Sequence, residues 1–192
     1  VADMELLTEN DSDGIFAITD LQPDTRYYFY LRHQDDSGVR AAARLLPLEG
    51  GRNFRDLGGY TTTAGNIVKW GRVFRPGHMA DLTPGDYQYL SGLGIRVVCD
   101  YRSTEQRAAY PTNWAAGEIE YLTREYTSDT DEGSLRAMLT NPQLTPEFLA
   151  ENMAAGYYDG IEEHKESYSK MFHKLAEGNI PLAFNCSAGK DR

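Results

Sequence analysis

Ile180-Pro-Leu-Ala-Phe-Asn-Cys-Ser-Ala-Gly-Lys-Asp-Arg192 is the stretch of this chain that decides its fold. Residues 180–184 are apolar and predict a buried β-strand. Cys186 follows, and a loop of small residues with Gly189 at its centre leads to Arg192, six places after the cysteine. In α/β proteins, loops at the carboxyl ends of parallel strands carry the ligand sites, so we expect the functional groups of this chain here.

The residue types in this loop suit an anion. Ser187, Ala188 and Gly189 are small enough for the backbone to curl around a phosphate or sulfate ion. Converging backbone N–H groups would hold Cys186 as a thiolate, and the planar fork of Arg192 matches two phosphate oxygens. The pattern therefore predicts a cysteine nucleophile for phosphate esters. The alternative from residue types alone is a buried strand cysteine followed by a polar turn.

Three segments of the chain carry a family resemblance. Residues 186–192 resemble the Cys-x-Ala-Gly-Lys-Asp-Arg loop of the bacterial cysteine-dependent protein-tyrosine phosphatases, the group that includes the secreted tyrosine and lipid phosphatase of mycobacteria. Residues 49–60 contain Arg-Asn-Phe-Arg-Asp-Leu-Gly-Gly, which is similar to the segment that opens that family's catalytic domain. Residues 73–79 resemble its Phe-Arg-Ser-Gly-His segment. The three matches occur in order, which makes them more specific together than the loop alone.

The resemblance implies a chemistry and a set of site residues. It implies hydrolysis of phosphotyrosine in proteins, with dual specificity as a further expectation, through a phosphocysteine intermediate and without a cofactor or a metal. The alternatives are a phosphoinositide phosphatase and a catalytically weak phosphate-binding scaffold. The implied residues are the catalytic Cys186 and Arg192, and the phosphate-binding Ser187, Ala188, Gly189, Lys190 and Arg55. The alternative for Arg55 is a structural role.

Several carboxyl groups are candidates for the general acid. Asp100 is favoured, because Asp100-Tyr-Arg102 resembles the family's Asp-x-Arg after a central strand. Its alternative is a structural salt bridge to Arg102 or Arg192. Asp191 is the second catalytic candidate, and its alternative role is to orient Arg192 or water. An acidic residue in the loop 126–132 is the third candidate.

The chain departs from the family pattern in two places. Asn185 stands where the family usually has a histidine, so this position has no titratable charge. The family also continues after the arginine with a Thr-Gly pair and a helix, whose N-terminus would face the phosphate. We therefore expect residues 47–192 to be the N-terminal part of a longer catalytic domain. An exported or periplasmic location is favoured over a cytoplasmic one.

Composition excludes several classes of partner. The formal net charge is −10, which argues against nucleic acid and anionic membrane surfaces as bulk partners. No apolar run approaches the roughly 18 residues of a membrane span. Two cysteines form neither a disulfide framework nor a metal cluster. The expected partner is a phosphorylated protein or a phosphoinositide, drawn by local positive charge.

The pattern of elements predicts two parts. Residues 1–46 form a β-rich accessory segment, either the tail of a fibronectin III-like sandwich or a small appendage, with strands expected at 15–18, 26–32 and 39–46. Residues 47–192 predict a parallel sheet flanked by helices. Helix starts are expected at Thr83, Ser103 and Thr145. A last helix is expected from Ile161, and its core stripe should contain Tyr168, Met171, Phe172 and Leu175.

Overall fold

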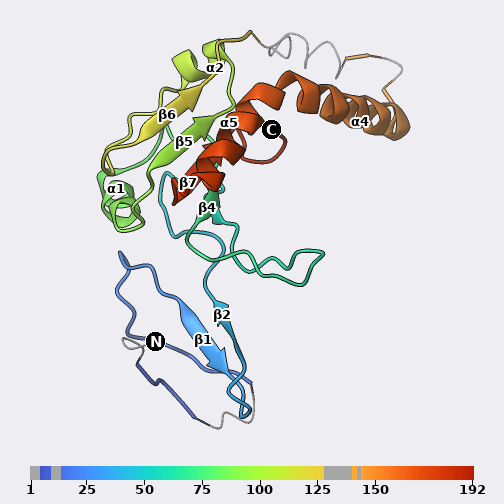
Figure 1. Cartoon of the computed structure of the whole chain (residues 1–192). Coiled ribbons are helices and arrows are strands. Elements are labelled where there is room, and N and C mark those ends of the chain that lie inside the picture. The colour runs from blue at the N-terminus through green and yellow to red at the C-terminus, as the bar shows by residue number, and fades with distance from the viewer. Residues whose placement is uncertain (1–4, 10–13, 128–139, 142–143) are drawn as a thin grey trace.

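A mostly parallel sheet of five strands forms the centre of the computed structural model, which describes residues 5–9, 14–127, 140–141 and 144–192. The strands are β3 (Arg55–Asp56), β4 (Val73–Arg75), β5 (Val97–Asp100), β6 (Glu120–Thr123) and β7 (Leu182–Asn185). Their order is β3-β4-β7-β5-β6, and only the β3–β4 pair is antiparallel. The last strand therefore lies in the middle of the sheet, as Figure 1 shows.

Helices cover both faces of this sheet. On one face, α1 (Pro84–Ser91) contributes Tyr89 and Leu90 to a core that includes Val98 of β5 and Ala183 of β7. On the other face, α5 (Lys165–Ala176) packs its Met171 against a second set of strand residues, Val97, Cys99 and Leu182. Neighbouring residues of β5 thus point to opposite cores, which explains why that strand is apolar without alternation. The predicted α/β fold is confirmed.

Local capping signals set the helix starts. Thr83 and Ser103 each close a capping box, at the start of α1 and of α2 (Thr104–Ala109). The Thr145 hydroxyl accepts from the Phe148 N–H at the start of α4 (Pro146–Glu163). These three predicted starts are confirmed. Side-chain acceptors at these positions satisfy N–H groups that lack a partner within the helix.

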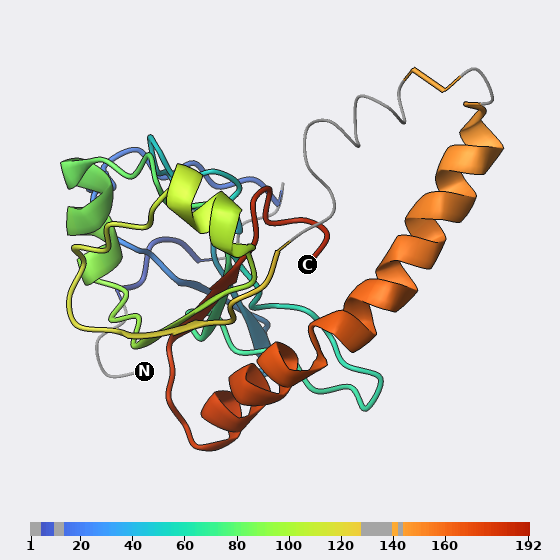
Figure 2. The same cartoon turned by 90° about the horizontal axis from the view of Figure 1, so that it is seen from above.

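Two details of the predicted helices are wrong. The helix expected from Ile161 begins at Lys165 instead, because the chain turns at His164, whose side chain is buried against Tyr101 and Tyr126. Phe172 was expected in the core stripe of this helix but is 63% exposed. Figure 2 shows α4 projecting from the body and α5 lying against the sheet.

The N-terminal segment forms a separate two-stranded antiparallel sheet. Its strands are β1 (Phe29–Arg32) and β2 (Gly38–Ala41), and it lies at the far end of the molecule from α2 and α4 (Figure 1). The strand expected at 15–18 is wrong, because none of these residues belongs to a strand. Several contacts join the segment to the rest of the chain. Among them, Arg26 forms a buried ion pair with Asp56 at 3.0 Å, and the Trp70 indole donates to the Arg40 carbonyl at 2.9 Å.

Candidate active site

Cys186 follows the central strand directly, and its side chain is buried. Burial raises the pKa of its thiol, but backbone N–H groups of Arg192, Lys190 and Asp191 donate to the sulfur and, with the nearby charge of Arg75, outweigh burial. The pKa of Cys186 therefore lies below its ordinary value. The loop accordingly has the converging amides that a thiolate or an oxyanion requires.

The outer side of the loop is held by residues of the upstream motif. The Gly189 carbonyl accepts from the Arg55 guanidinium and, at 3.4 Å, from the Asn53 amide, which also donates to the Ala188 carbonyl at 3.1 Å. A trans peptide directs its C=O and its N–H in opposite directions. When Arg55 and Asn53 hold the Gly189 carbonyl outward, the same peptide presents the Lys190 N–H inward to the sulfur.

The structure places Arg55, predicted as a phosphate ligand, behind the loop. Its guanidinium donates to two backbone carbonyls, those of Asn53 and Gly189. Ser187, Ala188, Gly189 and Lys190 lie in the loop that follows β7.

Gly189 is required by the close approach of a second segment. Its φ is +68°, and a Cβ at this position would stand 2.5 Å from the Pro76 carbonyl oxygen. The same segment supplies the His78 N–H to the Ser187 carbonyl at 3.0 Å, and the Gly77 N–H to the Arg52 carbonyl at 2.8 Å. All three motifs of the sequence therefore meet at one loop.

Arg192 lies across the mouth of the loop. Its Nη2 donates to the Ser187 hydroxyl at 3.2 Å. Its Nη1 donates to the Gln106 side-chain oxygen at 3.0 Å and to the Tyr126 hydroxyl at 2.9 Å. These neutral partners orient the guanidinium without neutralising its charge, which stays available to an anion.

Asp100 is buried at the end of β5, next to the loop. Both its oxygens accept from the Arg102 guanidinium, at distances of 2.6–3.0 Å. One oxygen also accepts from the Asn185 amide at 3.0 Å, and the other from the Tyr121 hydroxyl. This arrangement corresponds to the structural ion pair that was the alternative to a role as general acid. It also gives Asn185 a function, because this side chain ties the strand of the nucleophile to that pair.

Asp191 has the opposite environment, with a side chain 43% exposed at the rim of the loop. Its Oδ1 accepts from the Tyr157 hydroxyl of α4 at 2.6 Å and lies 3.7 Å from the Lys190 ammonium. Unlike the buried carboxyl group of Asp100, the carboxyl group of Asp191 can be reached from solvent. Asp129 and Asp131, the acids expected in the loop 126–132, lie outside the described residues.

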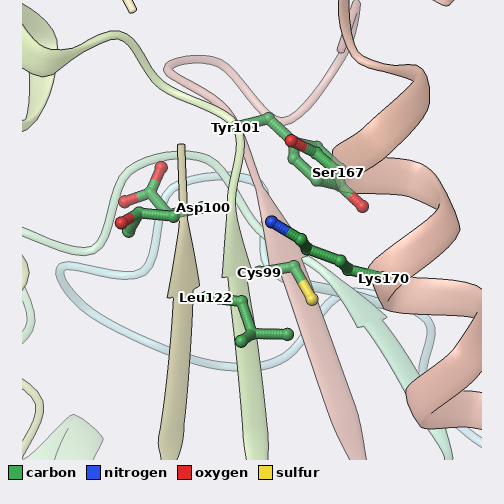
Figure 3. A pocket seen from close by; sticks show the side chains of 7 residues that line it. Cys99, Asp100, Tyr101, Leu122, Ser167 and Lys170 are labelled. Carbon is green, nitrogen blue, oxygen red and sulfur yellow. The ribbon is translucent and has the colours of Figure 1, made fainter. Parts of the chain in front are cut away.

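Cys99 provides an internal comparison. It is as buried as Cys186 and lies on the neighbouring strand, but burial and the Glu120 charge raise its pKa to about 12. Figure 3 shows its sulfur facing α5, beside Lys170 and Ser167. The space there is about 10 Å³, room for one water and not for a phosphate.

Several contributors to the site were not predicted from the sequence. Arg75 acts on the Cys186 sulfur through its charge, and its position in the third motif was the available signal. Gln106 and Tyr126 orient Arg192. Neither has a local signal, because both come from elements distant in sequence. Among the described residues, no group of three or more His, Cys, Asp or Glu side chains could hold a metal ion. No described helix is long and apolar enough to cross a membrane.

Comparison with known proteins identifies the family. The sequence model described as "Tyrosine phosphatase family" matches residues 46–192. The chain belongs to this phosphatase family. A curated relative from Cupriavidus necator, named "Putative tyrosine-protein phosphatase H16_A0669", is 32% identical over 143 residues, which cover 73% of this chain and 50% of that protein. A "Tyrosine-protein phosphatase" of Nostoc commune is 23% identical over 119 residues, covering 62% of this chain and 38% of that protein. The chain thus spans about half the length, or less, of the phosphatases it matches.

Proposed function

We propose that this chain carries the nucleophile and phosphate-binding loop of a phosphomonoester hydrolase acting on phosphotyrosyl proteins. The observation that supports it most is the contrast between the two cysteines. Both are buried, yet only Cys186 receives N–H groups from its own loop and has a lowered pKa. A phosphate ester needs a thiolate nucleophile and convergent donors for its oxygens, and both occur at this position.

The proposed reaction has two displacements. The Cys186 thiolate attacks phosphorus, a bond between sulfur and phosphorus forms, and the bond to the tyrosine oxygen breaks. That oxygen takes a proton from the Asp191 carboxylic acid. Water then attacks phosphorus, the thiolate leaves, and the proton of the water passes to Asp191. Loop N–H groups and Arg192 hold the phosphoryl oxygens throughout, most strongly where charge spreads in the transition states.

We propose Asp191 rather than Asp100 as the acid because of its exposure. Asp100 is buried and engaged by Arg102, Asn185 and Tyr121, so its proposed role is to fix the strand ends beside the loop. The proposed role of Arg55 is also structural: its guanidinium holds the Gly189 carbonyl so that this carbonyl points away from the substrate.

The test is hydrolysis of p-nitrophenyl phosphate and a phosphotyrosyl peptide by the full-length protein. Cys186→Ser should abolish phosphate release, because an alcohol at this position stays protonated at neutral pH. Cys99→Ser is the matched control and should retain activity, since that thiol faces α5 and not the loop. Undiminished hydrolysis by the Cys186→Ser variant would exclude the proposal.

A further inference from the structure

Helix α4 touches the catalytic loop through one aromatic side chain. No residue of this helix is buried, and Figure 2 shows it extending away from the sheet. Tyr157 nevertheless reaches the loop, where its hydroxyl donates to Oδ1 of Asp191 at 2.6 Å. The bond to Asp191 raises the pKa of Tyr157, so its hydroxyl stays protonated and keeps donating at neutral pH.

This contact makes the two oxygens of Asp191 different. Oδ1 accepts from Tyr157 and also faces the Lys190 ammonium at 3.7 Å. Oδ2 receives no hydrogen bond or ion pair from the described part of the chain. A carboxyl torsion is otherwise broad and two-fold, so an unrestrained aspartate would present either oxygen. With Oδ1 occupied by a donor, a proton on the carboxyl group resides on Oδ2.

The position of Asp191 in the loop indicates what the difference between its two carboxyl oxygens could do. The Asp191 backbone N–H is among the groups that donate to the Cys186 sulfur, so this residue forms part of the cup around the nucleophile. Its side chain is 43% exposed at the rim. A substrate whose phosphoryl group enters the cup has its leaving oxygen on the outer side, where an in-line displacement requires it.

We propose that Tyr157 is a positioning residue that holds Asp191 with Oδ2 toward the leaving oxygen of the substrate. This inference rests on the proposed function and deepens it. In the first displacement the Oδ2 proton passes to the leaving oxygen as the phosphorus–oxygen bond breaks. In the second, Oδ2 takes a proton from the attacking water as the sulfur–phosphorus bond breaks. Tyr157 keeps its own proton in both steps.

The experiment measures kcat and KM of the full-length protein for aryl phosphates whose leaving phenols differ in pKa. Acid catalysis matters most for poor leaving groups, because a good one departs without a proton. Tyr157→Phe should therefore lower kcat about tenfold for phenyl phosphate, the usual effect of one lost hydrogen bond, and little for p-nitrophenyl phosphate. KM should not change. Asp191→Asn should show the same trend with a loss of about 10²-fold or more for phenyl phosphate.

A double-mutant cycle separates positioning from a general effect on the fold. In the Asp191→Asn background, Tyr157→Phe should cause no further loss, because the group it orients is gone. Tyr158→Phe is the matched control on the same helix; that side chain is 76% exposed, and its variant should behave as wild type.

Each outcome decides the inference. If wild type is active and Tyr157→Phe has the same dependence on leaving-group pKa, the inference fails while the proposed function stands. Additive losses in the double mutant would also overturn it. If the wild-type protein hydrolyses none of the aryl phosphates, the proposed function fails and takes this inference with it.

Discussion

Replacing Gly189 by alanine tests whether the shape of the catalytic loop depends on its close contact with Pro76 and Gly77. A non-glycine residue at a φ of +68° costs roughly 1–2 kcal/mol. The new Cβ would also stand 2.5 Å from the Pro76 carbonyl oxygen and 2.6 Å from the Gly77 nitrogen, whereas real Cβ contacts essentially never fall below 3.0 Å. The loop must therefore move away from Pro76 to fit the methyl group.

This movement should damage catalysis more than stability. It displaces the Lys190 N–H, which is one of the donors to the sulfur. Loss of one such donor typically lowers kcat by about 10²–10³-fold. The pKa of Cys186 should rise as well, because a group that lowers it has been removed. Both effects are measured together, by following hydrolysis of p-nitrophenyl phosphate and alkylation of Cys186 across pH.

Gly65→Ala is the matched control. Its φ is +79°, and no atom lies within 4 Å of an added Cβ, so this variant bears the backbone cost without a clash. Both variants should lower Tm, by about 2–8 °C for 1–2 kcal/mol in a chain of this size. Only Gly189→Ala should lose activity. Wild-type kcat in Gly189→Ala, or an equal loss in Gly65→Ala, would refute the reasoning.

Two further predictions concern charged side chains. Arg75→Met removes a charge that lowers the pKa of Cys186, so the alkylation profile should move to higher pH and reaction at neutral pH should slow; an unmoved profile would contradict this. Arg26→Met leaves the Asp56 carboxylate buried without its ion-pair partner and should lower the free energy of unfolding by about 3 kcal/mol in urea. Asp56→Asn in the same chain should restore part of it. A loss below about 0.5 kcal/mol would show that the pair contributes little.

The elements that could be predicted from sequence are those with local causes. Thr83, Ser103 and Thr145 start helices because each side chain satisfies an N–H group three residues on. The apolar run before Cys186 predicts a buried strand because it is too short and too apolar to be anything exposed. The conformation of the loop after Cys186 also has a local cause, because its small residues and its glycine favour a curled backbone.

The failures have a common cause in distant contacts. Residues 15–18 have strand-like residue types but form no strand, because residue types alone do not determine whether a stretch joins a sheet. The boundary at His164 depends on aromatic rings from two other segments. For Arg55 the sequence left a substrate-binding and a structural role open, and the contact of its side chain with Gly189 depends on where the distant loop folds back. Tyr157 is exposed on a helix, and nothing in the sequence around it predicts a contact with the catalytic loop.

The ion pair between Arg26 and Asp56 bears on how the protein can be divided experimentally. The family match begins at residue 46, twenty residues after the arginine. A recombinant fragment cut at that point would keep Asp56 and its two backbone donors, Gly58 and Gly71, but would lose the cation beside them. The limits of a homologous region are therefore a poor guide for expression of this protein, and a soluble fragment should start upstream of residue 26.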